Sequence, residues 1–418
     1  MIERTGLFLA VALLALPTVV AIADAPIDVT RFDDPPGSSC DPNGCSLRQA
    51  ILLANATPGA DTITLHPGKY KLKLRGDDAT AVAGDLDVTD AVTIQGDPAG
   101  GTIIDAKAAK DRAFEVFDGA SLTLTHVTVK GGNVGALQDG GAIFSVGTLA
   151  IDHSIITGNK AGNSGGGIAC EDGTCTLTDV VVTKNKAVDN DGGGLELINE
   201  SSSTLLRVTI SKNSAGDTGG AIDSDEGATV SIADSTVSGN KSKSEGGGLD
   251  PSVGTVTVTN TTISGNKSAK GGGIQLESGG TLTLDHVTIA NNKAKEGGGL
   301  WTEAGTTATL TSTLLAANKP FDCFGPIVSN GSNLVGAIDG CTITGDTTGN
   351  ITGGPKPAKP VKALLAALKD NGGPTKTHAL KPGSPAINAD MGSCPPPSND
   401  QRGLPRVAPC DIGAFEVQ

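Results

Sequence analysis

The feature that most constrains this chain is an internal repeat of about 26 residues. Each copy contains a run of alternating apolar and polar residues, then an asparagine, then a glycine cluster. The marker asparagines are Asn159, Asn185, Asn213, Asn240, Asn266, Asn292 and Asn318. The clusters that follow begin at Gly165, Gly192, Gly219, Gly246, Gly271 and Gly297. Because one short repeat cannot bury its apolar face alone, such units have to stack on one another.

Three columns of apolar residues run through the aligned copies. Two precede the marker asparagine, as Ile151 and Ile156 do, and the third follows the glycines, as Ile168 does. Alternation around these positions predicts strands with one buried face, hence three short strands per copy. A propeller blade would need about 40–50 residues. We therefore predict an all-β, single-stranded parallel β-helix over residues 61–345, with the clearest repeats over 133–319.

Composition agrees with stacked coils. Of 418 residues, 59 are glycine and only 2% are aromatic. The interior must then be built from Val, Ile, Leu and Ala, whose short side chains repeat well along a tube. The formal net charge of −14 disfavours nucleic acid as a partner.

The N-terminus and the cysteines indicate export. Residues 1–23 are expected to be a signal peptide, because an apolar run ends in Ala21-Ile22-Ala23. No later segment is apolar enough to cross a bilayer, so we expect an extracellular protein without a membrane span after cleavage. Eight cysteines fit four disulfides in an oxidising compartment. Local pairing is the simplest hypothesis: Cys40 with Cys45, Cys170 with Cys175, Cys323 with Cys341, and Cys394 with Cys410.

Both ends of a coil stack expose strand edges and need covers. For residues 24–60 we predict an N-terminal cap, in which a capping-box pattern at Ser46 opens a helix running to about Ala56. For residues 346–418 we predict a C-terminal cap that folds over the last coil. Val361–Lys369 would form a second short amphipathic segment there.

These two ends resemble known protein families. Cys45-Ser46-Leu47-Arg48-Gln49-Ala50-Ile51 resembles the N-terminal motif of CSLREA-domain bacterial surface proteins, with Gln49 in place of the usual Glu. The segments at Asn371–Thr375, Thr377–Leu380, Gly383–Ile387, Asp400–Gly403 and Asp411–Glu416 resemble the choice-of-anchor Q region. The resemblance implies a secreted right-handed β-helix of the pectate-lyase-like superfamily, built from PbH1 repeats and often held at the cell surface. No sorting signal follows Asp411–Glu416, so covalent attachment is not expected.

Two acidic columns follow the glycines. One contains Glu196, Asp223 and Asp250, then Gln275 and Trp301; the other contains Glu171, Asp225, Glu277 and Glu303. Neighbouring coils would place such carboxylates roughly 5 Å apart on an outward face. They could share a proton, hold Ca²⁺ or act as a retaining pair of carboxylates. The weak catalytic candidates are Glu196, Asp223 and Asp250, and the ligand-binding candidates are Asp225, Gln275, Glu277, Trp301 and Glu303. The plainer interpretation is an ordinary acidic surface.

Three other columns deserve the same comparison. The histidines of Asp152-His153 and Asp285-His286 share a column of mixed residues that is typical of a solvated turn. A lysine follows all but one marker asparagine, and this row would either bind anionic polysaccharide or only discourage association. Two threonine rows, near Thr174 and Thr176, resemble ice-binding surfaces, although Thr also favours exposed strand positions.

We therefore expect a secreted, monomeric β-helix protein that binds glycans or surfaces without catalysis. One alternative is a polysaccharide lyase or glycoside hydrolase that acts on acidic polysaccharide. A lesser alternative is ice binding through the threonine rows. We expect polysaccharide or cell-surface glycan as the partner, and no cofactor other than the Ca²⁺ that the acidic columns could hold.

Overall fold

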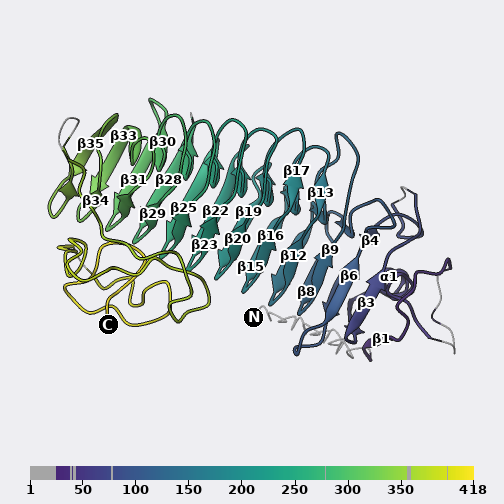
Figure 1. Ribbon diagram of the computed structural model, residues 1–418. Helices are drawn as coiled ribbons and strands as arrows, with labels where there is room; N and C mark the ends of the chain where they lie inside the picture. The colour runs from purple at the N-terminus through teal and green to yellow at the C-terminus, as the bar shows by residue number, and fades with distance from the viewer. Residues whose placement is uncertain are drawn as a thin grey trace, which may run out of the picture.

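The computed structural model describes residues 25–37, 40, 44–76, 79–277, 279–354, 359–392 and 394–418. The predicted signal peptide, residues 1–23, lies outside this part of the chain. The described chain forms a parallel β-helix whose coils stack along one axis (Figure 1). Within it, no helix is both long and apolar enough to span a membrane.

Three sheets run along the stack. The threonine-rich sheet contains β1 (Ile27–Val29), β2 (Ala60–Leu65), β5 (Ala91–Gln95), β8 (Ser121–Thr125), β11 (Thr148–Asp152), β15 (Thr174–Thr178), β19 (Ser202–Leu206), β22 (Ala228–Ala233), β25 (Gly254–Thr259), β28 (Gly280–Asp285), β31 (Thr307–Thr311), β33 (Cys323–Asn330) and β35 (Cys341–Asp346). The acidic sheet contains β4 (Leu86–Val88), β7 (Phe114–Val116), β10 (Ile143–Ser145), β14 (Ile168–Glu171), β18 (Leu195–Ile198), β21 (Ile222–Ser224), β24 (Leu249–Pro251), β27 (Ile274–Leu276) and β30 (Leu300–Thr302).

The third sheet, here the docking sheet, contains β3 (Gly68–Lys71), β6 (Thr102–Asp105), β9 (Thr128–Lys130), β12 (Ile155–Thr157), β16 (Val181–Thr183), β20 (Thr209–Ser211), β23 (Thr236–Ser238), β26 (Thr262–Ser264), β29 (Thr288–Ala290), β32 (Leu314–Ala316), β34 (Leu334–Val335) and β36 (Ile351–Thr352). The short strands β13 (Lys160–Ala161) and β17 (Lys186–Ala187) pair at a turn. Strand β33 pairs with both β30 and β31, so it joins the acidic and threonine-rich sheets.

The predicted apolar columns form the core. Each coil passes through the acidic, threonine-rich and docking sheets in turn, and one apolar column belongs to each sheet. The columns headed by Ile151, Ile156 and Ile168 are all buried. In register, Ile168 pairs with Leu195 and Leu195 with Ile222, so like side chains stack on like. The register and the burial of these columns therefore confirm the predicted coils.

The marker asparagines point inward and form a hydrogen-bonded ladder. The side-chain Nδ2 of Asn213 donates to Asn240 Oδ1 at 3.1 Å and to the Val182 carbonyl at 3.0 Å. The same oxygen of Asn240 accepts the Asn213 backbone N–H at 2.9 Å. The pattern runs from Asn159 to Asn318, where Asp322 accepts the last bonds. The asparagines therefore do not adopt the positive φ of the turn themselves; it falls on the preceding residue, as at Lys212.

The N-terminal end contains the helix α1 (Leu47–Ala56), where the capping-box pattern predicted it. Ser46 Oγ accepts the Gln49 N–H, and Gln49 Oε1 accepts the Ser46 N–H, so the amide fills the role of the usual Glu. Arg48, in the first turn of this helix, is buried and donates to Asp34 at 2.7 Å and to backbone carbonyls such as that of Gly84.

The four disulfides are those of the local-pairing hypothesis. They join Cys40 to Cys45, Cys170 to Cys175, Cys323 to Cys341, and Cys394 to Cys410. Such bonds are consistent with an oxidising compartment.

The C-terminal region differs from expectation. It does not only cover the last coil but folds back along the docking sheet, from β34 as far as β23 (Figure 1). Gln401 Oε1 accepts from Thr262 Oγ1 at 2.6 Å, and His378 Nε2 lies 2.8 Å from Ser264 Oγ. An apolar cluster that includes Leu314, Ile412 and Phe415 seals the contact. The segment predicted to be amphipathic, Val361–Lys369, has no regular helix or strand and forms isolated antiparallel bridges at Leu365 and Lys369.

The same docking explains why one turn column is not uniformly solvated. All residues of the column that contains His153 and His286 have positive φ, which fits the predicted turn. His153 is exposed, but Asn260, His286 and Ser312 are buried under the C-terminal region. Burial here comes from a distant segment, so the repeat could not reveal it.

Candidate functional site

The most concentrated group of ionisable side chains lines a pocket of about 220 Å³ on the outer side of the acidic sheet. The carboxylates of the pocket are Asp139, Glu171, Asp191, Glu196, Asp223, Asp225 and Glu226. Phe144 supplies an aromatic wall, and Asn163 and Ser164 add neutral polar groups. We call this the acidic pocket.

Adjacent strands position the first acidic column. Glu196 of β18 pairs with Asp223 of β21, which pairs with Asp250 of β24. Their neighbours Leu195 and Leu197 point into the core, so alternation turns the carboxylates outward. The register predicted for Glu196, Asp223 and Asp250 is therefore observed.

Their exposure, however, is not as predicted. Glu196 and Asp223 are each only 6% exposed, and Asp250 is 3% exposed. The first glycine of each cluster folds over the strand residue four positions later. A Cβ on Gly219 would lie 2.6 Å from the Cβ of Asp223, and this glycine also has a φ of 58°. The turn therefore needs glycine for both reasons, and it hides a column that alternation alone placed on an open face.

Burial changes the chemistry of these carboxyl groups. Loss of hydration, followed by repulsion from neighbouring carboxylates, raises the pKa of Glu196, Asp223 and Asp250 well above its ordinary value. Glu196 Oε2 and both Asp250 carboxyl oxygens are buried without a hydrogen-bond partner. Such groups are rare in folded proteins and mark a place for a proton, an ion or a ligand.

A shared hydroxyl indicates where one proton lies. Thr218 Oγ1 is 2.8 Å from Asp191 Oδ1 and 2.7 Å from Asp223 Oδ1. One hydroxyl proton can be donated to only one of these oxygens. Thr218 therefore donates to one carboxyl group at a time, and the raised pKa of Asp223 favours a proton on the Asp223 carboxyl group in this arrangement.

The second acidic column is interrupted. Glu171 of β14 pairs with Ile198, so it is not adjacent to Asp225 as the sequence suggested. Glu171 and Asp225 both line the acidic pocket, and Glu171 accepts from Asn199 Nδ2 at 2.6 Å. Glu277 and Glu303 lie farther along the sheet, outside the residues that line the pocket.

Gln275, Glu277 and Trp301 form a separate cluster. Gln275 Nε2 donates to Glu245 and, at 3.0 Å, to Glu277 Oε1, and it holds the two carboxyl groups together. Sharing with Glu245 raises the pKa of Glu277 to about 7. Trp301 is only partly exposed, because Phe324 stacks on its ring and the Lys270 ammonium lies 5.2 Å from the ring centroid. Trp301 therefore lacks the open ring face expected of a sugar platform.

Sequence reasoning missed one column of the site. The residue before each glycine cluster supplies Asp139, Asp191, Thr218, Glu245 and Lys270. Thr218 N donates to Asp191 Oδ1 at 2.9 Å, so this turn column is tied across coils. Its position five residues before the acidic column could have identified it. Phe144 occupies the acidic-column register in an earlier coil, where the repeat is faint.

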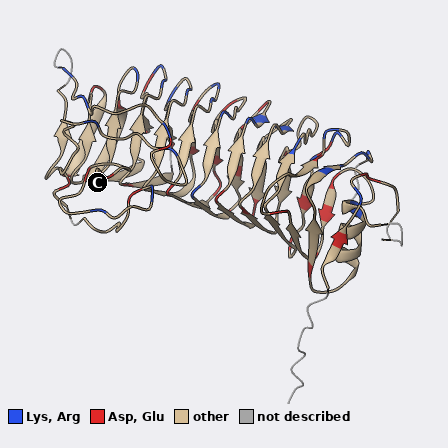
Figure 2. Ribbon diagram, turned by 60° about the horizontal axis from the view of Figure 1, so that its bottom comes forward, with Lys and Arg blue, Asp and Glu red and all other residues tan. Residues whose placement is uncertain are grey.

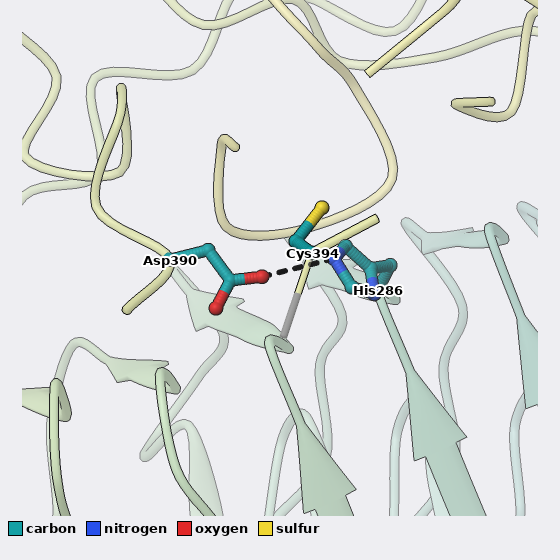
Figure 3. Close-up of side chains that lie close together, drawn as sticks. All are labelled: His286, Asp390 and Cys394. Atoms are coloured by element: carbon teal, nitrogen blue, oxygen red, sulfur yellow. Dashed lines mark hydrogen bonds and ion pairs between the residues drawn. The ribbon is translucent and has the colours of Figure 1, made fainter. Parts of the chain in front are cut away.

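Three further groups have the composition of a metal site, and each already has a different partner. His286 Nε2 lies 3.2 Å from Asp390 Oδ2 beside Cys394, whose sulfur is bonded to Cys410 and offers no thiolate (Figure 3). In the second group, Asp179 is bound by both arms of Arg207, at 2.8 and 2.7 Å.

In the third group, Arg112 places its guanidinium 3.4 Å from Asp85 and 2.5 Å from Glu115. An arginine charge thus already occupies the position that a cation would take.

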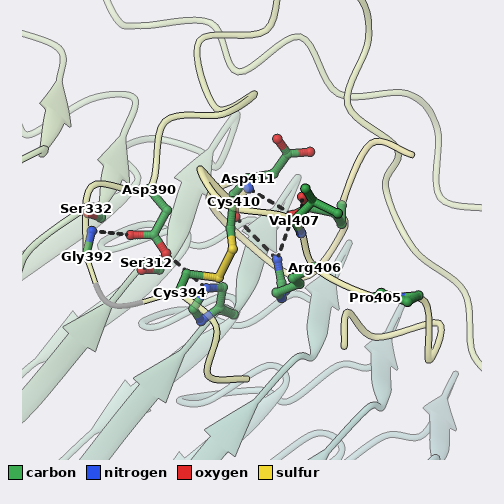
Figure 4. Close-up of a disulfide and its surroundings, with 12 residues drawn as sticks. Ser312, Ser332, Asp390, Gly392, Cys394, Pro405, Arg406, Val407, Cys410 and Asp411 are labelled. Atoms are coloured by element: carbon green, nitrogen blue, oxygen red, sulfur yellow. Dashed lines mark hydrogen bonds and ion pairs between the residues drawn. A yellow bond between two sulfur atoms is a disulfide. The ribbon is translucent and has the colours of Figure 1, made fainter. Parts of the chain in front are cut away.

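Around the Cys394–Cys410 disulfide, Asp390 also accepts from Ser312 Oγ at 2.8 Å and from the Gly392 N–H at 2.8 Å (Figure 4). This arrangement anchors the C-terminal region on the docking sheet.

Comparisons with known proteins agree with the architecture. A family model for the right-handed β-helix region matches residues 197–354, and no curated protein matches. The crystal structure of pectate lyase Pel9A is similar over 94% of this chain and 97% of that chain, with 14% identity and a TM-score of 0.54. The A-module of the Azotobacter vinelandii mannuronan C-5 epimerase AlgE6 shares 15% identity over 77% of this chain and 97% of its own, with a TM-score of 0.45. The fold is a right-handed parallel β-helix, as predicted.

Proposed function

We propose that this chain is a secreted β-helix protein that binds a neutral carbohydrate, without catalysis, in the acidic pocket. The supporting observation is a small pocket that is lined by seven carboxyl groups and by the aromatic side chain of Phe144. Carboxylates accept hydrogen bonds from sugar hydroxyls, and an aromatic wall packs against the apolar face of a sugar ring. The unpartnered Glu196 Oε2 is one acceptor that such a hydroxyl would satisfy.

Charge favours a neutral ligand over an acidic one. With several carboxylates so close together, a ligand carboxylate would meet strong like-charge repulsion in a partly buried site. A neutral sugar avoids that repulsion, and its hydroxyls replace their hydrogen bonds to water with hydrogen bonds to the carboxyl groups of the pocket. The resemblance of Cys45–Ile51 and Asp411–Glu416 to bacterial surface proteins, together with the predicted signal peptide, supports an extracellular setting.

A glycan array followed by calorimetry on the best ligand tests the proposal. Phe144→Ala and Glu196→Gln should each weaken binding at least tenfold. The first removes the aromatic contact with the sugar ring, and the second removes a carboxylate that accepts a hydrogen bond from a sugar hydroxyl. Trp301→Ala is the matched control, because Trp301 lies outside the pocket, and it should bind like the parent. Loss of binding in Trp301→Ala alone, or no binding to any neutral glycan, contradicts the assignment.

Glycoside hydrolysis is the second candidate. The observation in its favour is the Asp191–Thr218–Asp223 arrangement, which places two carboxyl groups on one hydroxyl, with the pKa of Asp223 raised by burial. General acid and base or nucleophile roles require such a pair. The pectate lyase of similar fold illustrates that a β-helix can support chemistry on polysaccharides. New reducing ends released from a neutral polysaccharide and abolished by Asp223→Asn would establish hydrolysis; their absence across a broad panel would leave binding alone.

A further inference from the structure

A row of lysines lies at the turn that leads from the docking sheet back to the acidic sheet. Each of these lysines directly follows a rung of the asparagine ladder. The members are Lys160, Lys186, Lys241, Lys267, Lys293 and Lys319, with Ser214 between the second and third. Parallel bridges join each member to the next through the whole series. We call this the lysine row, and Figure 2 shows blue segments at successive turns along one edge of the stack.

The backbone holds the row at a fixed spacing. The N–H of Lys267 donates to the carbonyl of Asn240 at 3.0 Å, and Lys293 donates to Asn266 at 2.9 Å. The asparagine side chains lock the same turn from inside. Successive lysines therefore start from Cα atoms separated by one coil rise, about 4.8 Å. The row is a rigid linear array, unlike lysines scattered over loops.

The charges of the row are not neutralised by the protein. All six lysines are exposed, and none has an ion pair among the described residues. This is unexpected, because the chain has 45 acidic and 31 basic residues and acidic partners are abundant. Like charges at this separation repel by up to about 1 kcal/mol per neighbouring pair even in water. Six aligned, unpaired ammonium groups therefore favour an anionic partner of matching repeat.

We propose that the lysine row binds an extended acidic polysaccharide, a linear chain with a carboxylate or sulfate on each sugar. One sugar residue is about as long as one coil rise, so its anionic group can face a lysine at every rung except that of Ser214. The row contains no aromatic side chain, and single-stranded nucleic acids usually need such rings for base stacking. The acidic pocket excludes polyanions by charge, so the two surfaces would select different glycans.

Retention on immobilised acidic polysaccharide and titration with a size-defined acidic oligosaccharide test the row. The variant K241Q/K267Q/K293Q should bind at least tenfold more weakly, and binding by the parent should fall steeply as salt rises, because released counterions drive it. The control K71Q/K73Q/K107Q removes the same charge from exposed lysines elsewhere and should bind like the parent.

Three outcomes would overturn the proposal: equal loss in both triple variants, binding that salt does not weaken, or equal affinity for single-stranded DNA of the same charge. Since every substitution is at an exposed side chain, folding can be verified by an unchanged melting temperature. Phe144→Ala should leave polyanion binding intact, so failure of the pocket proposal and failure of the row remain distinguishable.

Discussion

Two columns of buried polar side chains run along the same coils, and they differ in whether their polar atoms are satisfied. In the asparagine ladder, Asn240 both donates and accepts within the protein. In the acidic column, Asp250 has two buried oxygens with no partner. The coils, the spacing and the degree of burial are similar in the two cases.

The difference separates a fully hydrogen-bonded column from a partly hydrogen-bonded one. A buried polar network whose groups are all hydrogen-bonded rigidifies a fold. A network with unpaired buried groups instead lowers the free energy of unfolding, because those groups have lost their hydrogen bonds to water. The ladder is therefore understood as part of the architecture. The acidic column has buried oxygens without a hydrogen-bond partner, which is the observation behind the proposed binding site.

Breaking the ladder should have the largest effect. Asn240→Ala removes the oxygen that accepts from the backbone N–H and the side-chain Nδ2 of Asn213, and it removes the donor to the Ile210 carbonyl, at about 1–3 kcal/mol per unsatisfied group. We expect a loss of about 3–5 kcal/mol in the free energy of unfolding, measured by denaturant titration. Lys241→Ala, at the exposed neighbouring position, should change it by no more than about 0.5 kcal/mol. Equal effects would show that the ladder contributes nothing specific.

Changing pH should act on the buried carboxyl groups along the stack, among them Asp322, which ends the asparagine ladder. In the folded protein the pKa of Asp322 is raised to about 6, that of Glu277 to about 7 and that of Asp85 to about 8. A raised carboxyl pKa means that the folded state holds more protons than the unfolded state between about pH 4 and these values, so stability falls as pH rises through that window.

The melting temperature should therefore decrease from pH 5 to pH 8, as scanning calorimetry would show. His378 opposes this trend, because burial lowers its pKa and favours the folded state at higher pH. Asp390 contributes outside the window, since its lowered pKa matters only as pH falls below its ordinary value. A melting temperature that rises over this range would contradict the assignment of proton-loaded carboxyl groups.

Neutralising one acidic rung should stabilise the protein. Asp250→Asn removes a buried charge next to Asp223 while keeping the shape of the side chain. We expect a gain of about 1–2 kcal/mol at pH 8 and a smaller gain at pH 5, because the raised pKa of Asp250 leaves less charge on the parent carboxyl group at lower pH. Thermal unfolding at both pH values measures this, and destabilisation at pH 8 would mean that Asp250 has a structural partner.

Removing the shared hydroxyl should have the smallest effect on stability. Thr218→Val keeps the side-chain shape but deletes the bridge between Asp191 and Asp223. We expect a loss of less than about 1.5 kcal/mol and a change in the titration of Asp223, followed by NMR of the carboxyl carbons. A titration curve identical to that of the parent would exclude the proton-sharing arrangement.

Much of the fold could be predicted because equivalent residues of consecutive repeats are also neighbours in space. A residue such as Ile210 meets its equivalents one coil away, so a column in the aligned copies is also a column in space. Local chemistry likewise predicted the helix that begins after Ser46 and the pairing of Cys170 with Cys175. The site was predicted in part: Glu171, Glu196, Asp223 and Asp225 do meet in the pocket, whereas Gln275, Glu277, Trp301 and Glu303 lie elsewhere.

The sequence by itself determined the coil, the three apolar columns and the rows of equivalent polar residues, because their spacing is set by period and strand geometry. Tertiary structure alone decided which polar columns are buried. The turn at Gly219 covers Asp223, and the distant His378 and Gln401 cover Ser264 and Thr262. Burial of a polar group depends on what packs over it, and neither a glycine turn folding back nor a segment more than 100 residues away is visible in a repeat of about 26 residues.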